Sequence, residues 1–145
     1  MKAEQLTLSA SATAALKAFR DSKPWRGSLD QRREKFETFH AALCEATGLT
    51  PELVLLEVER DAGVVTGGNG GYSGRRNTIV LAGKLSVVTY LFAFGLLAGL
   101  DGRDEAMKWA RGLFKHFFPR SAAGCVEVGG LMLRRPPTEV TEDEA

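Results

Sequence analysis

An uncharged, strongly apolar run of 16 residues, from Leu85 to Leu100, constrains this chain more than any other feature. Lys84 and Asp101 bound the run directly. A helix needs about 20 apolar residues to cross a bilayer, so we predict a buried core helix and no membrane span. The chain has 145 residues, of which 44% are hydrophobic and 26% charged, which suffices for one domain with its own core.

Two helices are predicted before this run. The first is Ala-rich and covers residues 9–21. The second begins at Ser28, which forms a capping box with Gln31, and ends at Gly48, a residue typical of the position after a helix. Its apolar residues recur at helical spacing: Leu29, Phe36, Phe39, Leu43 and Ala46.

A small sheet is predicted next. Residues 53–59 alternate in polarity and indicate a strand, with a short helix as the alternative, and residues 77–81 indicate a second strand. Between them, residues 63–74 hold six glycines and are predicted to be a loop. This loop contains no GxGxxG and no Gly-Lys-Ser/Thr, so a phosphate-binding motif is excluded.

After the core helix, Asp101 is expected to cap a helix over residues 102–118, which Pro119 ends. Residues 126–128 and 131–133, joined by two glycines, predict a hairpin. The predicted fold class is α+β, with two N-terminal helices, a small β-sheet, two packed core helices and a C-terminal hairpin. One domain, 1–138, would precede an acidic tail, 139–145.

The charges are unevenly distributed along the chain. The tail carries four acidic residues and no basic one, whereas the remainder has 19 basic and 14 acidic residues. We expect a solvated tail, or alternatively one that shields a basic surface. Cys44 and Cys125 lack metal-binding or redox spacing, and the first residues lack the apolar stretch of a signal peptide. We therefore expect free thiols and a cytoplasmic location.

Within the core helix, positions 92, 93 and 96 have the spacing of a His-Glu-x-x-His motif. In that motif two histidines on one helix face bind zinc, and the glutamate acts on a zinc-bound water. Here the three positions hold Phe92, Ala93 and Leu96. None of these side chains can ligate a metal or transfer a proton.

The surrounding residues resemble the small zincin metallopeptidases, most nearly the group related to phage antirepressor and radiation-response peptidases. The resemblance covers about residues 50–120 and is carried by Tyr72, residues 77–81, Thr89, Leu91, Gly95, Glu105-Ala106, Trp109-Ala110, Leu113 and Pro119. It implies a zincin-like fold, with Glu105 in the third zinc-ligand position. Such sites need three protein ligands, so no catalytic residue, metal or cofactor is expected.

The former active-site pocket is then expected to be mostly hydrophobic. We assign to it Tyr72, Thr89, Phe92, Ala93, Leu96, Glu105, Trp109 and His116. The predicted function is a metal-free, non-catalytic domain, either a natural pseudoenzyme or a ligand-stripped scaffold. It would bind a peptide, a small apolar ligand or a protein partner.

Three alternatives remain open. One is an active hydrolase or peptidase that uses Glu105 with His116. Another is a nucleic-acid-binding module that uses Arg75, Arg76 and other basic residues. The third concerns assembly: if the apolar helix is not covered within the domain, it would favour a homo-oligomer.

Overall fold

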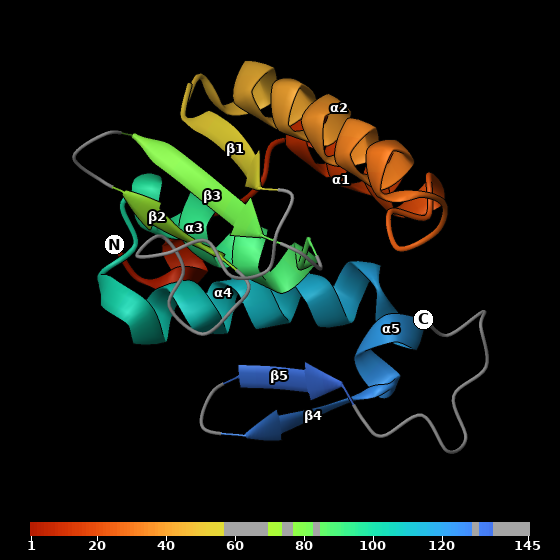
Figure 1. Ribbon diagram of the computed structural model, residues 1–145. Helices are drawn as coiled ribbons and strands as arrows, with labels where there is room; N and C mark the ends of the chain where they lie inside the picture. Colours follow the sequence, from red (N-terminus) through yellow and green to blue (C-terminus); the bar gives the residue numbers. More distant parts are fainter. Residues whose placement is uncertain (57–69, 74–76, 83–84, 129–130, 135–145) are drawn as a thin grey trace.

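The computed structural model is a mixed α+β structure in which helices predominate (Figure 1). It describes residues 1–56, 70–73, 77–82, 85–128 and 131–134. The predicted α+β class is confirmed at this level. The predicted tail, 139–145, lies outside the described residues.

The two N-terminal helices pack against each other at the top of Figure 1 as α1 (Ala10–Asp21) and α2 (Leu29–Thr47). Ser28 accepts a hydrogen bond from the Gln31 N–H, and the Gln31 side chain reaches back to the Ser28 N–H, so the predicted capping box is confirmed. Gly48 ends α2 with φ 76°, a left-handed conformation that favours glycine. The two helices are joined in the core by stacked Phe19 and Phe39 rings, 4.2 Å apart.

A three-stranded sheet follows, in the order β1-β3-β2. Its strands are β1 (Glu52–Leu56), β2 (Gly70–Ser73) and β3 (Thr78–Ala82). Strand β3 is the central strand, parallel to β1 and antiparallel to β2, and its Ile79 and Leu81 are fully buried.

The loop prediction for residues 63–74 is wrong at residues 70–73, because β2 forms there. Hydrogen bonds to the backbone of β3 stabilise this strand despite its glycines. The rest of that stretch lies outside the described residues.

The apolar run forms α3 (Val87–Leu97), which packs against β2 and β3 and against α4 (Gly102–Phe117). Helix α3 begins two residues later than the start of the run, with Ser86 as its N-cap. Helix α4 packs closely against Gly95 of α3: a Cβ there would lie 3.0 Å from Trp109 Cε3 of α4 and 2.8 Å from Cδ1 of Leu100, which lies between the two helices. Within the described part of the chain, no helix has the length and hydropathy needed to cross a membrane.

The described part of the chain ends in a short helix and a hairpin, which lie below α4 in Figure 1. Pro119 follows the end of α4 as predicted, but it also begins a short helix, α5 (Pro119–Ala123), that the sequence did not predict. Strands β4 (Cys125–Val128) and β5 (Leu131–Arg134) are antiparallel and confirm the two strands of the hairpin.

Candidate functional site

The three positions with the zinc-motif spacing lie on α3 where it meets α4. Ala93 is fully buried, whereas Phe92 and Leu96 are half-buried against the core. The guanidinium of Arg103, in the first turn of α4, lies 5.7 Å from the centre of the Phe92 ring, which is a cation–π distance. This part of the α3–α4 face is therefore apolar, with one cation above it.

Glu105 contacts the N-terminal segment of the chain. Its Oε1 accepts a hydrogen bond of 2.8 Å from the backbone N–H of Ala3, which belongs to a short 3₁₀ helix, η1 (Ala3–Gln5). Two further contacts hold this segment against α4: an ion pair between Glu4 and Lys108, and a 2.9 Å hydrogen bond from the Trp109 indole to the Leu6 carbonyl. The carboxylate that the zincin resemblance assigns to a metal is thus engaged by backbone.

Asp101 does not cap α4 through its side chain, contrary to the sequence prediction. Its carboxylate forms an ion pair with the N-terminal ammonium of Met1 instead. The pKa of Asp101 is lowered, chiefly by this hydrogen bond to the ammonium. The reason for the wrong prediction is tertiary: the chain terminus lies close enough to compete for the carboxylate.

The other assigned residues are distributed around this region. Trp109 is buried against Gly95. Thr89 is half-buried in the first turn of α3, where its N–H donates to Ser86 Oγ. Tyr72 pairs with Ile79 across the β2–β3 ladder, and its side chain lies outside the described part of the structure.

His116 lies apart from this group. It is exposed in the last turn of α4, with its ring edge-on to Phe117 at 4.8 Å, whereas Glu105 is in the first turn. Eleven residues of helix separate the two by about 16 Å along the axis. No described contact joins Glu105 and His116, so the structure does not assemble them as an acid–base pair.

Phe92 and Leu96 do not fit a metal that the resemblance would imply, because neither offers a donor atom. Among the residues that the structure describes, no three His, Cys, Asp or Glu side chains converge on a common point. The side chains of Phe92 and Leu96 can therefore make apolar contacts but cannot bind a metal.

A second polar group, which the sequence did not single out as a unit, lies between α2 and α3. His40 Nδ1 is 2.6 Å from the Tyr90 hydroxyl, and His40 Nε2 is 2.7 Å from the Pro51 carbonyl. Because a carbonyl can only accept, Nε2 carries the proton and Nδ1 accepts from Tyr90. The Cys44 sulfur lies 3.5 Å from Nε2.

Burial sets the ionisation of all three side chains. It lowers the pKa of His40 and raises the pKa values of Cys44 and of the fully buried Tyr90. The neutral imidazole of His40 is a poor base, because both of its nitrogens are already hydrogen-bonded. The protonated thiol of Cys44 is a poor nucleophile. This group therefore ties α2 to α3 and to the start of β1.

Sequence spacing predicted neither the contact of His40 with Tyr90 nor that of Glu105 with the N-terminal segment. His40 and Tyr90 are fifty residues apart, and Ala3 and Glu105 more than a hundred. The one local signal is that His40 directly follows Phe39, an apolar residue of the second predicted helix, which favours a place for His40 at the edge of the core.

In comparisons with known proteins, no family model, no curated protein and no solved structure matches this chain. The fold is therefore described by its own elements, and the resemblance to zincin metallopeptidases stays an expectation from the sequence.

Proposed function

We propose that this chain is a metal-free, non-catalytic binding protein of zincin-like architecture. The observation that carries the proposal is the state of the α3–α4 face. Phe92 and Leu96 occupy the positions where the resembled family has its two histidines, and the Glu105 carboxylate already accepts the Ala3 N–H. Such a zinc site needs three protein ligands. This face offers only the carboxylate of Glu105, which is already hydrogen-bonded to the backbone of Ala3.

The apolar substitutions also favour a binding role on energetic grounds. Unmetallated polar side chains at half-buried positions cost free energy unless they are hydrogen-bonded, whereas Phe and Leu gain from the same burial. The ligand we propose is a peptide, a small apolar molecule or a protein partner that contacts the half-buried side chains of Phe92 and Leu96.

The zinc content of the protein tests the metal-free part of the proposal. Purified without added metal or chelator, the chain is expected to hold less than about a tenth of an equivalent, because a lone carboxylate cannot hold zinc. About one equivalent of zinc would overturn the proposal.

A gain-of-metal variant tests the architecture. If α3 and α4 have the zincin arrangement, the double variant Phe92→His/Leu96→His supplies three ligands together with Glu105, and we expect it to bind one zinc. Adding Glu105→Gln to the double variant should abolish the binding, with far-UV circular dichroism as the control for folding. A folded double variant that binds no zinc would contradict the zincin-like arrangement of α3 and α4.

The binding role is tested with an apolar fluorescent probe such as anilinonaphthalene sulfonate. We expect Phe92→Ala to reduce probe binding, because it removes an aromatic side chain that is half-buried on this face. Leu113→Ala is the matched control: Leu113 is also half-buried against the core, but it lies about two turns of α4 beyond Glu105. Equal loss in both variants would count against a ligand site at Phe92.

A further inference from the structure

A cavity of about 630 Å³ lies at the other end of α4, away from the face described above. One wall is the end of α1 and the α1–α2 connection, and the other is the junction of α4 and α5. We call it the basic groove, because Arg20, Lys23, Arg26 and Arg120 line it, against one carboxylate, Asp21. Its volume falls within the range of small-molecule sites, about 300–1,000 Å³.

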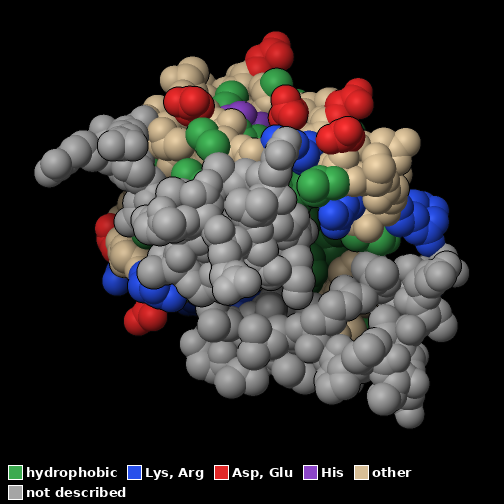
Figure 2. All heavy atoms as spheres, viewed as in Figure 1, with side chains coloured by type: hydrophobic (Ala, Val, Ile, Leu, Met, Phe, Trp, Pro, Cys, Tyr) green, Lys and Arg blue, Asp and Glu red, His purple; other side chains and the backbone are tan. Residues whose placement is uncertain are grey.

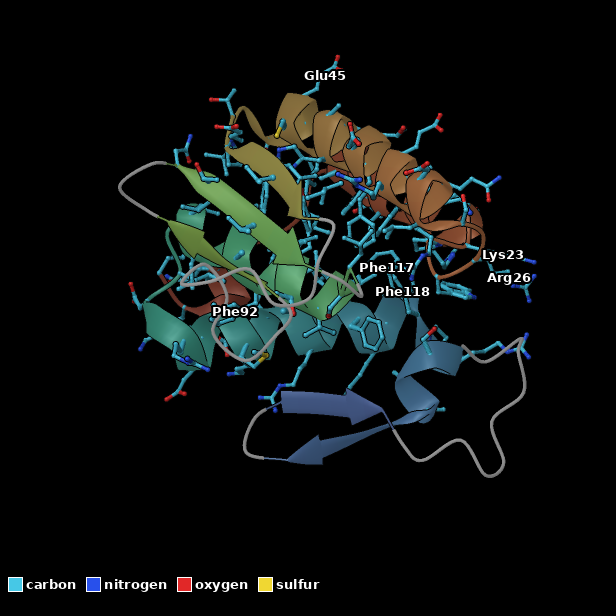
Figure 3. All side chains as sticks on the ribbon, in the orientation of Figure 1. Lys23, Arg26, Glu45, Phe92, Phe117 and Phe118 are labelled. Carbon is cyan, nitrogen blue, oxygen red and sulfur yellow. The ribbon has the colours of Figure 1, made fainter. Side chains whose placement is uncertain are left out.

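The two walls of the basic groove are joined through the aromatic core. The Phe118 ring, only 3% exposed, stands edge-on to both Trp25 and Phe19, with centroids 6.1 Å apart in each case. Figure 3 shows Phe117 and Phe118 at the end of α4, on the inner side of Lys23 and Arg26, whose side chains extend outward. The position of one wall is therefore fixed relative to the other.

The backbone that presents the cations is also fixed. The Lys35 ammonium donates to the carbonyls of Lys23 and Arg26, at 3.1 and 3.2 Å, and the Arg26 N–H donates to the Lys23 carbonyl at 2.9 Å. A ligand that binds here therefore has to order side chains but not the backbone of the connection.

The basic groove has an excess of positive charge. Asp21 pairs with Arg20 Nε at 3.0 Å, and no other acidic residue lines the described cavity, while Lys23 and Arg120 are exposed on opposite walls. Figure 2 shows Lys and Arg side chains gathered over the α1–α2 connection with hydrophobic side chains between them, whereas Asp and Glu gather over α2. An anion between the walls would relieve the repulsion among the cations.

Aromatic rings accompany these charges. Trp25 is half-buried at the edge of the basic groove and His116 is exposed beside it. The Trp25 Nε1 is buried without a hydrogen-bond partner among the described residues. Cations that follow phosphates, combined with rings on which bases stack, are the usual means of binding single-stranded nucleic acid.

We infer that the basic groove binds a nucleotide, with its phosphate between Lys23 and Arg120 and its base against Trp25. The nucleotide is either free or a unit of a single strand. This inference is independent of the proposed function, which concerns the opposite end of α4. It also differs from the sequence alternative based on Arg75 and Arg76, which lie outside the described residues.

The test is fluorescence anisotropy of a labelled twelve-nucleotide oligo(dT), together with titrations of adenosine monophosphate and of inorganic phosphate followed by tryptophan fluorescence. Trp25 and Trp109 are the two tryptophans of the chain, so base stacking should quench a signal that Trp25→Phe removes. If the free nucleotide binds as tightly as the oligonucleotide, the ligand is the free form. If the oligonucleotide binds more tightly, the ligand is a strand.

The matched variants locate the site. Lys23→Gln/Arg120→Gln removes one exposed cation from each wall. Lys2→Gln/Lys17→Gln, the control, removes two exposed cations that do not line the basic groove. We expect the first pair to weaken binding about 10- to 30-fold and to reduce the slope of log K against log salt by about 0.7, because the two cations hold one phosphate. The control should weaken binding less than about twofold and leave the slope unchanged.

Three results would overturn the inference. One is no binding of oligonucleotide or nucleotide by the wild-type protein at about 50 mM salt, where phosphate contacts are strong. Another is equal weakening by the two pairs of variants. The third is displacement of the bound nucleotide by polyglutamate at the same charge concentration, which would show that charge alone is recognised.

Discussion

Replacing Gly95 with alanine is expected to destabilise the protein, although this change normally stabilises the interior of a helix by about 1 kcal/mol. A Cβ at this position would lie 2.8 Å from Leu100 Cδ1 and 3.0 Å from Trp109 Cε3. Leu100 and Trp109 are only 5% and 7% exposed, and the Trp109 indole is held by its hydrogen bond to the Leu6 carbonyl. Overpacking of a core costs about 1–3 kcal/mol, so we expect a net loss of about 1 kcal/mol.

Gly112→Ala is the matched control. Gly112 lies in the interior of α4, is exposed, and has no atom within 4 Å of an added Cβ. The same substitution should therefore stabilise the protein by about 0.5–1 kcal/mol. Both variants change helix propensity in the same way, but only the Cβ added at position 95 meets neighbouring side chains. The difference between the two variants therefore measures the cost of those contacts.

Urea unfolding followed by tryptophan fluorescence measures both variants. With a slope of about 2 kcal/mol/M, the midpoint should fall by about 0.5 M in Gly95→Ala and rise by about 0.3–0.5 M in Gly112→Ala. A Gly95→Ala midpoint at or above that of the wild type would refute the close approach of α3 and α4 at this residue.

Three further outcomes are expected from the same assay. Tyr90→Phe leaves His40 Nδ1 without its 2.6 Å donor and should cost about 1–2 kcal/mol. Because burial lowers the pKa of His40, the unfolded chain binds the proton more tightly. The contribution of neutral His40 to the free energy of unfolding is therefore complete above about pH 6.5. It is lost as the pH falls below that value, by at most about 1.4 kcal/mol per pH unit. The variant His40→Gln should remove this pH dependence. Ser28→Ala breaks the capping box of α2 and should cost about 1 kcal/mol.

Each of these outcomes can fail on its own. A Tyr90→Phe variant as stable as the wild type would mean that His40 finds another donor. If His40→Gln leaves the pH dependence between pH 6.5 and 5 unchanged, other groups produce it. An unchanged midpoint in Ser28→Ala would mean that tertiary packing alone holds the start of α2.

Local elements of this fold could be predicted because their causes lie within a few residues. The capping box at Ser28 and the left-handed Gly48 depend on groups three to four positions away. The uncharged run that contains α3 could only be buried, since it is apolar on every side and shorter than a bilayer span. The β-branched residues of β3 (Thr78, Ile79 and Val80) favour a strand for the same local reason.

Elements that depend on a distant partner could not be predicted. Strand β2 is glycine-rich, and pairing with β3 decides its conformation, whatever its side chains prefer. The side chain of Asp101 was available to cap α4 until the folded chain brought the Met1 ammonium beside it.

Sequence patterns predicted the four longer helices, two strands of the main sheet, both strands of the hairpin and the lack of metal donors at positions 92, 93 and 96. Only the tertiary structure decided that Glu105 binds the backbone of Ala3, that His40 meets Tyr90, and that Arg120 faces Lys23 across the basic groove. The physical reason is range: propensity and capping act between near neighbours in sequence, whereas hydrogen bonds and charges act between any groups that packing brings within a few ångströms.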